Sequence, residues 1–135
     1  MNDGPPNPDD VTEGRTFTHT RTFTPEDVER FVEVSGDENP HHVEPDDEGR
    51  LVVHGLLTGT LPTKIGGDLG YVARELNYAF HRPVRTGEAI TCEMTVTAVE
   101  ERADGRRIRT EYVCRNEAGE EVLTGDSDGI IFDEG

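Results

Sequence analysis

The sequence contains no tryptophan, a single lysine and two cysteines, and none of its apolar runs approaches the length of a membrane span. Because a transmembrane helix needs about 20 consecutive apolar residues, we expect no membrane partner. The cysteines, Cys92 and Cys114, form neither a CxxC pair nor a secreted disulfide framework, which predicts reduced and buried thiols. The opening stretch, MNDGPPNPDD, has neither the basic nor the apolar region of a secretion signal. Together these absences predict a cytoplasmic protein.

Positive charge is also scarce, since 13 Lys and Arg stand against 29 Asp and Glu, for a formal net charge of −16. Such a surface repels phosphate and carries no basic stripe, which argues against nucleic acid as a partner. Only 32% of the residues are hydrophobic, yet periodic apolar segments between residues 15 and 132 indicate a folded core. We interpret the composition as adaptation to concentrated salt, which screens self-repulsion; an acidic protein that binds a basic partner is the alternative.

The length of 135 residues suits one hydrophobic core and is too small for two. Residues 1–14 offer almost nothing apolar, so we predict a mobile acidic tail before a single domain of residues 15–135. Residues 15–23 alternate in the manner of a half-buried strand. A helix is then predicted to begin with Thr24 as its N-cap and to end at Gly36.

The stretch from Ser35 to His54, SGDENPHHVEPDDEGRLVVH, gathers carboxylates and three imidazoles around turn-forming glycine and proline residues. A carboxylate and an imidazole on one rigid turn can hold a water molecule between them, with one accepting and the other delivering a proton. Gly, Asp, Asn and Pro are also the commonest turn residues, so a loop without function is the alternative interpretation.

The longest apolar segment, Leu51 to Leu69, predicts a helix that begins at His54-Gly55 and is buried on all sides within a curved sheet. Pro62 interrupts this helix and predicts a kink near Thr63. The free N–H groups at the helix start, that of Gly55 above all, can stabilise a negatively charged oxygen. Alternatively, Gly55 serves only helix packing.

Four strand-like segments complete the chain, at residues 74–81, 89–100, 107–116 and 121–132. Hairpin turns at Asp104-Gly105 and at residues 117–119 separate the last three. A strand and helices followed by an antiparallel meander indicate an α+β fold.

The stretch from Ser35 to His54, with its flanking residues, resembles the signature of the R-specific enoyl-CoA hydratase family, also called hydratase 2 or MaoC-like dehydratases. Its matching positions are Phe31, Ser35, Gly36, Asp37, Asn39, Pro40, His42, Val53, His54 and Gly55. The resemblance continues through Gly66-Gly67, Tyr71 and the turn from Arg82-Pro83-Val84 to Gly87-Glu88, and so covers residues 15 to 132. It implies a hotdog fold, in which a curved antiparallel sheet wraps around a long buried central helix.

The resemblance implies that Asp37 and His42 form the catalytic pair, holding the water that adds across the double bond of trans-2-enoyl-CoA. The product is an (R)-3-hydroxyacyl-CoA, and the reaction runs in either direction. It needs a base for the water, an acid for the α-carbon and a donor to the thioester oxygen. Asp37 and His42 supply the base and the acid, and either residue can take either role. The Gly55 N–H is the candidate donor to the thioester oxygen.

Three further residues are expected to support the pair. Asn39 orients the turn or the pair, and His54 is either structural or in contact with the ligand or a carboxylate. Thr63 aligns with a serine that supports the catalytic aspartate in the family. The segment between His42 and His54 is shorter than in the family and carries Asp46-Asp47-Glu48-Gly49 in place of a small helix, which leaves acyl-length preference open.

Metal binding by His41, His42 and Asp37 is an alternative, but no His-x-x-x-His or Cys pair supports it, so no metal is expected. No cofactor is expected either, because the coenzyme A thioester is the substrate. Its phosphates require local positive charge, for which the candidates are Lys64, Arg74, Arg82 and Arg85. Each of these cations could equally be a surface ion-pair partner.

The resemblance also implies a homodimer, or a dimer of such dimers, in which sheets join edge to edge and cover exposed strand edges. Two other functions stay open. A hotdog acyl-CoA thioesterase would attack the thioester carbonyl with water, although the intact Asp-x-Asn-Pro-x-His motif disfavours it. A non-catalytic acyl-thioester-binding module would keep the motif as scaffold. The choice between coenzyme A and an acyl carrier protein, the direction and the pathway are also open.

Overall fold

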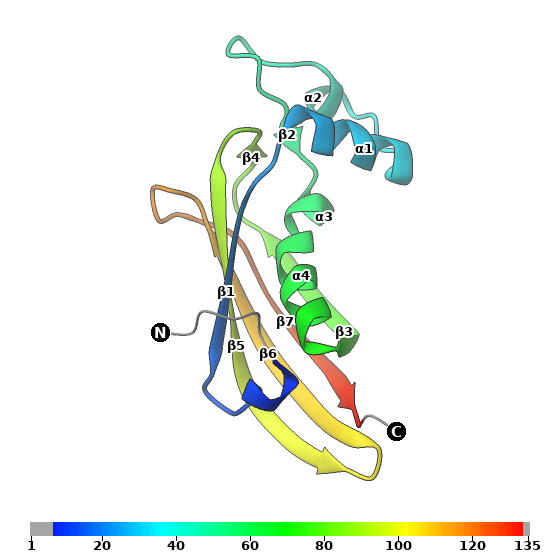
Figure 1. Ribbon diagram of the computed structural model, residues 1–135. Helices are drawn as coiled ribbons and strands as arrows, with labels where there is room; N and C mark the ends of the chain where they lie inside the picture. The colour runs from blue at the N-terminus through cyan, green and yellow to red at the C-terminus, as the bar shows by residue number, and fades with distance from the viewer. Residues whose placement is uncertain (1–6, 134–135) are drawn as a thin grey trace.

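A five-stranded antiparallel sheet curves around a central helix in the computed structural model, which describes residues 7–133 (Figure 1). The strands follow the order β1-β5-β6-β7-β3. Their bounds are Thr16–Thr22 for β1, Tyr71–Phe80 for β3, Ala89–Arg102 for β5, Gly105–Arg115 for β6 and Glu121–Phe132 for β7. This is the predicted α+β hotdog arrangement, with the sheet wrapped around the helix α4 (Thr60–Leu69).

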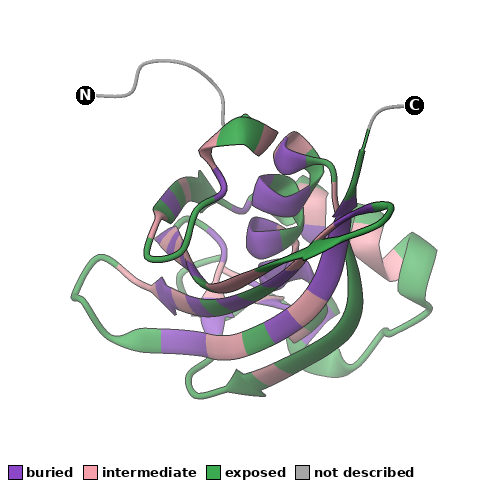
Figure 2. Ribbon diagram, turned by 90° about the horizontal axis from the view of Figure 1, so that it is seen from below, coloured by how far each residue is buried: buried purple, intermediate pink, exposed green. Residues whose placement is uncertain are grey.

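The core lies between α4 and the concave face of the sheet, where buried residues are drawn in purple (Figure 2). Leu61, Ile65 and Leu69 of α4 are each no more than 2% exposed. On β5, alternate residues are buried, as the period of two in a strand requires. Cys92 and Cys114 are directly opposed on β5 and β6, and both are free and buried, as predicted.

The central helix is divided at Gly59 into α3 (Gly55–Thr58) and α4, so the predicted kink near Thr63 is wrong. A Cβ atom on Gly59 would lie 2.7 Å from the Tyr78 ring, which explains the glycine. The Gly59 carbonyl accepts hydrogen bonds from the hydroxyls of Thr63 and Tyr78, each at 3.1 Å. Pro62 therefore lies in the first turn of α4, where it has no helical hydrogen bond to lose.

The predicted mobile tail is wrong for residues 7–14, and residues 1–6 lie outside the described part of the chain. Pro8–Asp10 form a 3-10 helix, η1, and Val11 is 1% exposed in the core. The Arg106 guanidinium donates to the carbonyls of Pro8 at 2.8 Å and Val11 at 3.1 Å. One apolar side chain and a distant arginine thus order a segment whose composition resembles that of a linker.

The remaining elements gather at one end of the molecule (Figure 1). They are α1 (Pro25–Ser35), α2 (Pro40–Val43) and the strands β2 (Val52–Val53) and β4 (Val84–Arg85), which pair with each other. Helix α1 begins with the expected Thr24 cap, in a capping box with Asp27, and ends at Gly36 with φ 74°. Among the described residues, no helix combines the length and the apolar character needed to cross a bilayer.

Candidate active site

A cleft of about 560 Å³ opens where α1, α2 and β2 meet the start of α3 and the end of β3. Its polar wall includes Asp37, His42 and His54, which come from three different elements or turns. Its apolar wall is formed by Phe31, Val52, Val53, Leu56, Phe80, Pro83, Val84 and Val122. The cleft therefore combines a small group of titratable side chains with a surface suited to an acyl chain.

Asp37 is held by the turn that follows α1. Its backbone N–H donates to the Ser35 hydroxyl at 3.0 Å, and its Oδ1 accepts from the Asn39 backbone N–H at 3.2 Å. Such an Asx turn fixes the carboxylate relative to its own backbone. The contribution of Asn39 seen here comes from its backbone, and the second carboxylate oxygen, Oδ2, faces His42.

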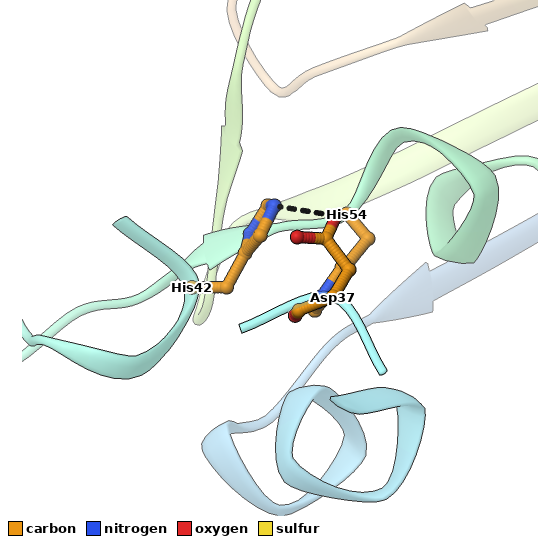
Figure 3. Close-up of side chains that lie close together, drawn as sticks. All are labelled: Asp37, His42 and His54. Atoms are coloured by element: carbon orange, nitrogen blue, oxygen red, sulfur yellow. Dashed lines mark hydrogen bonds and ion pairs between the residues drawn. The ribbon is translucent and has the colours of Figure 1, made fainter. Parts of the chain in front are cut away.

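His42 is oriented by a backbone carbonyl. Its Nδ1 lies 2.7 Å from the Val52 oxygen, and because a carbonyl can only accept, Nδ1 carries the proton. Nε2 is then an acceptor, 3.6 Å from Asp37 Oδ2 (Figure 3). That separation is too long for a direct hydrogen bond and short enough for one water molecule to contact both atoms. His41, the neighbouring residue, is exposed.

His54 contacts both members of this pair. Its ring stacks on that of His42, with centroids 3.6 Å apart and an interplanar angle of 15° (Figure 3). Its Nε2 donates to the Asp37 backbone carbonyl at 3.0 Å, which leaves Nδ1 as a buried acceptor without a partner among the described residues. Phe31 packs near the same ring at a centroid distance of 4.8 Å.

Asp37, His42 and His54 can each offer one ligand atom, all within 4.8 Å of one another. A metal ion binds an imidazole along the lone pair in the ring plane, and nearly parallel stacked rings direct their lone pairs along separate planes. The arrangement therefore does not fit a metal centre without reorientation of the rings.

Gly55 begins α3 at the wall of the cleft. The preceding His54 carbonyl accepts from the N–H groups of Leu57 and Thr58, each at 3.0 Å. Within residues 7–133, no protein acceptor is found for the Gly55 N–H itself. A Cβ atom on Gly55 would lie 2.8 Å from the Phe80 ring, so close packing also requires glycine here. Both interpretations of Gly55 are thus compatible with the geometry.

Thr63 does not join the site. It is exposed on α4 and donates to the Gly59 carbonyl rather than contacting Asp37. Thr58 lines the cleft instead and is 3% exposed. Its position three residues after Gly55 places both on one face of α3, a helical spacing that is visible in the sequence.

The four candidate phosphate ligands are dispersed. Only Arg82 lines the cleft, where it forms an ion pair with Glu120 at 3.2 Å. Arg85 is close by on β4 but faces Asp46 at 3.8 Å. Two candidates lie elsewhere: Lys64 pairs with Asp68 on α4, and Arg74 lines a separate hollow with Arg107 and Asp128. Sequence reasoning missed His81, which lines the cleft beside Arg82.

The acidic loop after α2 is held by Asp46. Its Oδ1 accepts from the backbone N–H groups of Glu48 and Arg50, each at 2.9 Å, and its Oδ2 accepts from the Arg50 side chain. The backbone N–H of Arg50 is the largest of the influences that lower the Asp46 pKa. Hydrogen bonds to a single carboxylate thus hold residues 46–50 in a compact loop.

The family described as "MaoC like domain" matches residues 7–118 of the chain. An (R)-specific enoyl-CoA hydratase of Rhodospirillum rubrum is 28% identical over 133 residues, covering 91% of this chain and 90% of that protein. A mitochondrial 3-hydroxyacyl-[acyl-carrier-protein] dehydratase of Arabidopsis thaliana is 30% identical over 129 residues, covering 87% and 76% respectively.

Solved structures show the same similarity. The (R)-hydratase of A. caviae involved in PHA biosynthesis superposes with a TM-score of 0.78 at 25% identity, over 90% of this chain and 97% of that one. The unliganded R-hydratase PhaJ1 of Pseudomonas aeruginosa gives a TM-score of 0.80 over 94% and 86%, and at 24% identity it supports the fold alone.

Proposed function

The chain belongs to the MaoC-like dehydratase family, and on that premise we propose that it is an (R)-specific 2-enoyl-CoA hydratase. It would add water to trans-2-enoyl-CoA to give (R)-3-hydroxyacyl-CoA, or catalyse the reverse dehydration. The observation that carries this proposal is the 3.6 Å separation between Asp37 Oδ2 and His42 Nε2 beside the start of α3. Membership of the family supports hydro-lyase chemistry in general, and the choice of substrate is our inference.

In the proposed mechanism a water molecule donates one hydrogen to Asp37 Oδ2 and the other to His42 Nε2. Its oxygen lone pair then faces C3 of the enoyl chain. As the C3–O bond forms, one of the two groups takes a proton and the π electrons move toward the thioester oxygen. The group that took the proton from water then delivers it to C2 of the enolate, so both side chains return to their starting state and the net change is the addition of one water molecule.

The enolate stage places negative charge on the thioester oxygen. The free Gly55 N–H, at the positive end of α3, is the proposed donor to that oxygen. A donor held in place before the reaction stabilises charge without reorganisation. The substrate itself carries the activating thioester, so the mechanism requires neither a metal nor a cofactor.

For the coenzyme A phosphates, Arg82 is the proposed contact among the four candidates. It lines the cleft and its side chain is 54% exposed, so it can turn from Glu120 toward a ligand. Replacement of Arg82 by Gln would test this by raising KM more than it lowers kcat. An acyl carrier protein would instead present one phosphate on a protein surface, and a comparison of the two carriers distinguishes the substrates.

A homodimer is proposed through the outer edge of β3. This strand pairs with β7 on one side, while the other edge is unpaired within the described residues. Val72, Leu76 and Phe80 on β3 are 48%, 49% and 52% exposed, which is unusual for large apolar side chains. Pairing with a second copy would cover both the strand edge and these side chains.

The deciding experiment follows the absorbance of the enoyl thioester and the release of free thiol in the same cuvette, for enoyl-CoA chains of increasing length. Hydration removes the enoyl absorbance without releasing thiol, and chiral analysis should give the (R) product. Release of thiol from the acyl-CoA would identify the thioesterase alternative. Saturable binding of the thioester without either signal would identify a binding module and overturn the enzymatic proposal.

A further inference from the structure

His54 lies where the two halves of the proposed catalytic pair meet. It belongs to neither the turn that carries Asp37 nor the helix that carries His42, since it is the residue that precedes α3. It nevertheless contacts both, through the 3.0 Å hydrogen bond to the Asp37 carbonyl and the 3.6 Å ring stack on His42. A single side chain therefore connects the turn, α2 and the start of α3.

The second ring nitrogen of His54, Nδ1, destabilises the folded state. Because Nε2 carries the proton that is donated to Asp37, Nδ1 is left as a bare acceptor. The residue is 3% exposed, and Nδ1 has no hydrogen-bond partner among the residues that the structure describes. A buried polar atom without a partner destabilises the folded state and calls for an explanation.

A purely structural histidine would be a poor choice at this position. A buried ring between Phe31 and His42 is served better by an apolar side chain, which has no nitrogen to leave unpaired. What an apolar ring lacks is the N–H that reaches the Asp37 carbonyl. The function of His54 should therefore lie in that hydrogen bond.

We propose that His54 is a positioning residue whose Nε2–H holds the Asp37 turn at the distance from His42 at which one water molecule contacts both. This inference rests on the proposed hydratase function for its catalytic consequence. The Asp37 side chain is 51% exposed, so packing alone does not fix it. Displacements of about 1 Å can cost on the order of a hundredfold in rate, which makes such a tether consequential.

Two substitutions separate the hydrogen bond from the ring. His54→Phe keeps an aromatic ring but removes the donor, and His54→Gln keeps a donor near the position of Nε2 but removes the ring. We expect His54→Phe to lower kcat at least about tenfold with little change in KM, and His54→Gln to retain activity within about threefold. The melting temperature of His54→Phe should stay close to that of the parent, because the unpaired Nδ1 and the hydrogen bond from Nε2 are removed together.

A structural role would give the opposite pattern, a lower melting temperature for His54→Phe with kcat unchanged, and that result would overturn the proposal. Equal losses of activity in both variants would also overturn it, because the ring and not the hydrogen bond would then matter. If the parent itself lacks hydratase activity, the proposed function fails. Crystal structures then decide the positioning role alone: an Asp37–His42 separation unchanged in His54→Phe would refute it.

Discussion

At the scale of residues, two backbone carbonyls determine which nitrogens can act. The Val52 carbonyl takes the Nδ1 proton of His42, and the Asp37 carbonyl takes the Nε2 proton of His54. Each imidazole therefore presents its lone pair on the opposite side of the ring. The Nε2 lone pair of His42 lies 3.6 Å from the Asp37 carboxylate, which is why His42 is the proposed partner in proton transfer.

Replacing Asp37 by Asn should abolish hydration and leave the fold intact. The Asn side-chain oxygen can still accept from the Asn39 N–H, but it cannot take a proton from water. We expect kcat to fall by about 10²–10⁴-fold. Steady-state kinetics measures the loss, and circular dichroism checks the fold. Glu38→Gln, on the neighbouring residue, serves as the matched control, and parent-like activity in Asp37→Asn would refute the catalytic assignment.

The pH dependence of stability should include a contribution from Asp27. The Thr24 backbone N–H, followed by the Arg21 side chain, holds the pKa of this carboxyl below its usual range. Because the folded pKa lies below the unfolded one, the stabilisation is present above the unfolded pKa, near 3.8, and is lost as pH falls through the folded pKa.

Urea unfolding of Asp27→Asn beside the parent tests this contribution. The variant loses the favourable charge at the α1 N-terminus, so it should be about 0.3–1 kcal/mol less stable at pH 7. The difference should shrink in acid, where the parent carboxyl is protonated. A difference that is constant from pH 7 to pH 2 would contradict the assignment, because it would not follow the titration of Asp27.

At the scale of elements, Gly55 at the start of α3 has to meet two requirements, a free backbone N–H and the absence of a Cβ atom. Gly55→Ala keeps the backbone N–H but drives a Cβ atom into the Phe80 ring. We expect the single variant to lose activity and also about 1–3 kcal/mol of stability, which is the usual cost of overpacking. In the double variant with Phe80→Ala the clash is removed, so if the N–H is the functional group its activity should match that of Phe80→Ala alone, which is the reference because Phe80 also lines the cleft. A double variant far less active than Phe80→Ala, with a normal fold, would leave Gly55 without the proposed oxyanion role.

The β3 edge gives a matched pair of surface substitutions. Leu76→Lys places a charge on the proposed dimer interface and should convert the dimer to a monomer, because a buried unpaired charge opposes association. Val34→Lys introduces the same charge on α1, at a position that is 85% exposed and away from the edge, and should change nothing. Sedimentation velocity measures both. A Leu76→Lys protein that stays dimeric would show that the interface lies elsewhere.

Elements bounded by local chemistry could be predicted from the sequence, whereas those bounded by distant contacts could not. The Thr24 cap, the Gly36 end of α1 and the alternation along β5 need only neighbouring residues. The break at Gly59, between α3 and α4, depends on Tyr78 of β3, and the order of residues 7–14 depends on Arg106 of β6.

The same division applies to the candidate site. Motif spacing brought Asp37, His42, His54 and Gly55 into one cleft, since they lie on one compact stretch of chain. It misplaced Thr63, because position in a motif does not give the direction of a side chain on a helix. The two orienting carbonyls were also missed, since every residue has a carbonyl and only the fold selects among them.

At the scale of the whole molecule, charge is the dominant feature. The formal net charge of −16 is carried by a chain with a single lysine. Many arginines are already paired with carboxylates, among them Arg107 with Asp128 and Arg115 with Glu93. The carboxylates that outnumber the cations therefore repel one another across the surface, and this repulsion opposes the compact state.

Salt should stabilise the protein by screening that repulsion. The Debye length falls from about 8 Å at 0.15 M to about 3 Å at 1 M, so unfolding midpoints should rise steeply over this range. A variant with four exposed, unpaired acids replaced by Gln should depend less on salt, because it has less repulsion to screen; Glu29, Glu33, Glu44 and Glu111 fit this description among the described residues. Thermal unfolding in potassium chloride from 0.15 to 3 M measures both proteins. Equal midpoints at all salt concentrations, or equal salt slopes in the two proteins, would refute adaptation to concentrated salt as the origin of the acidic surface.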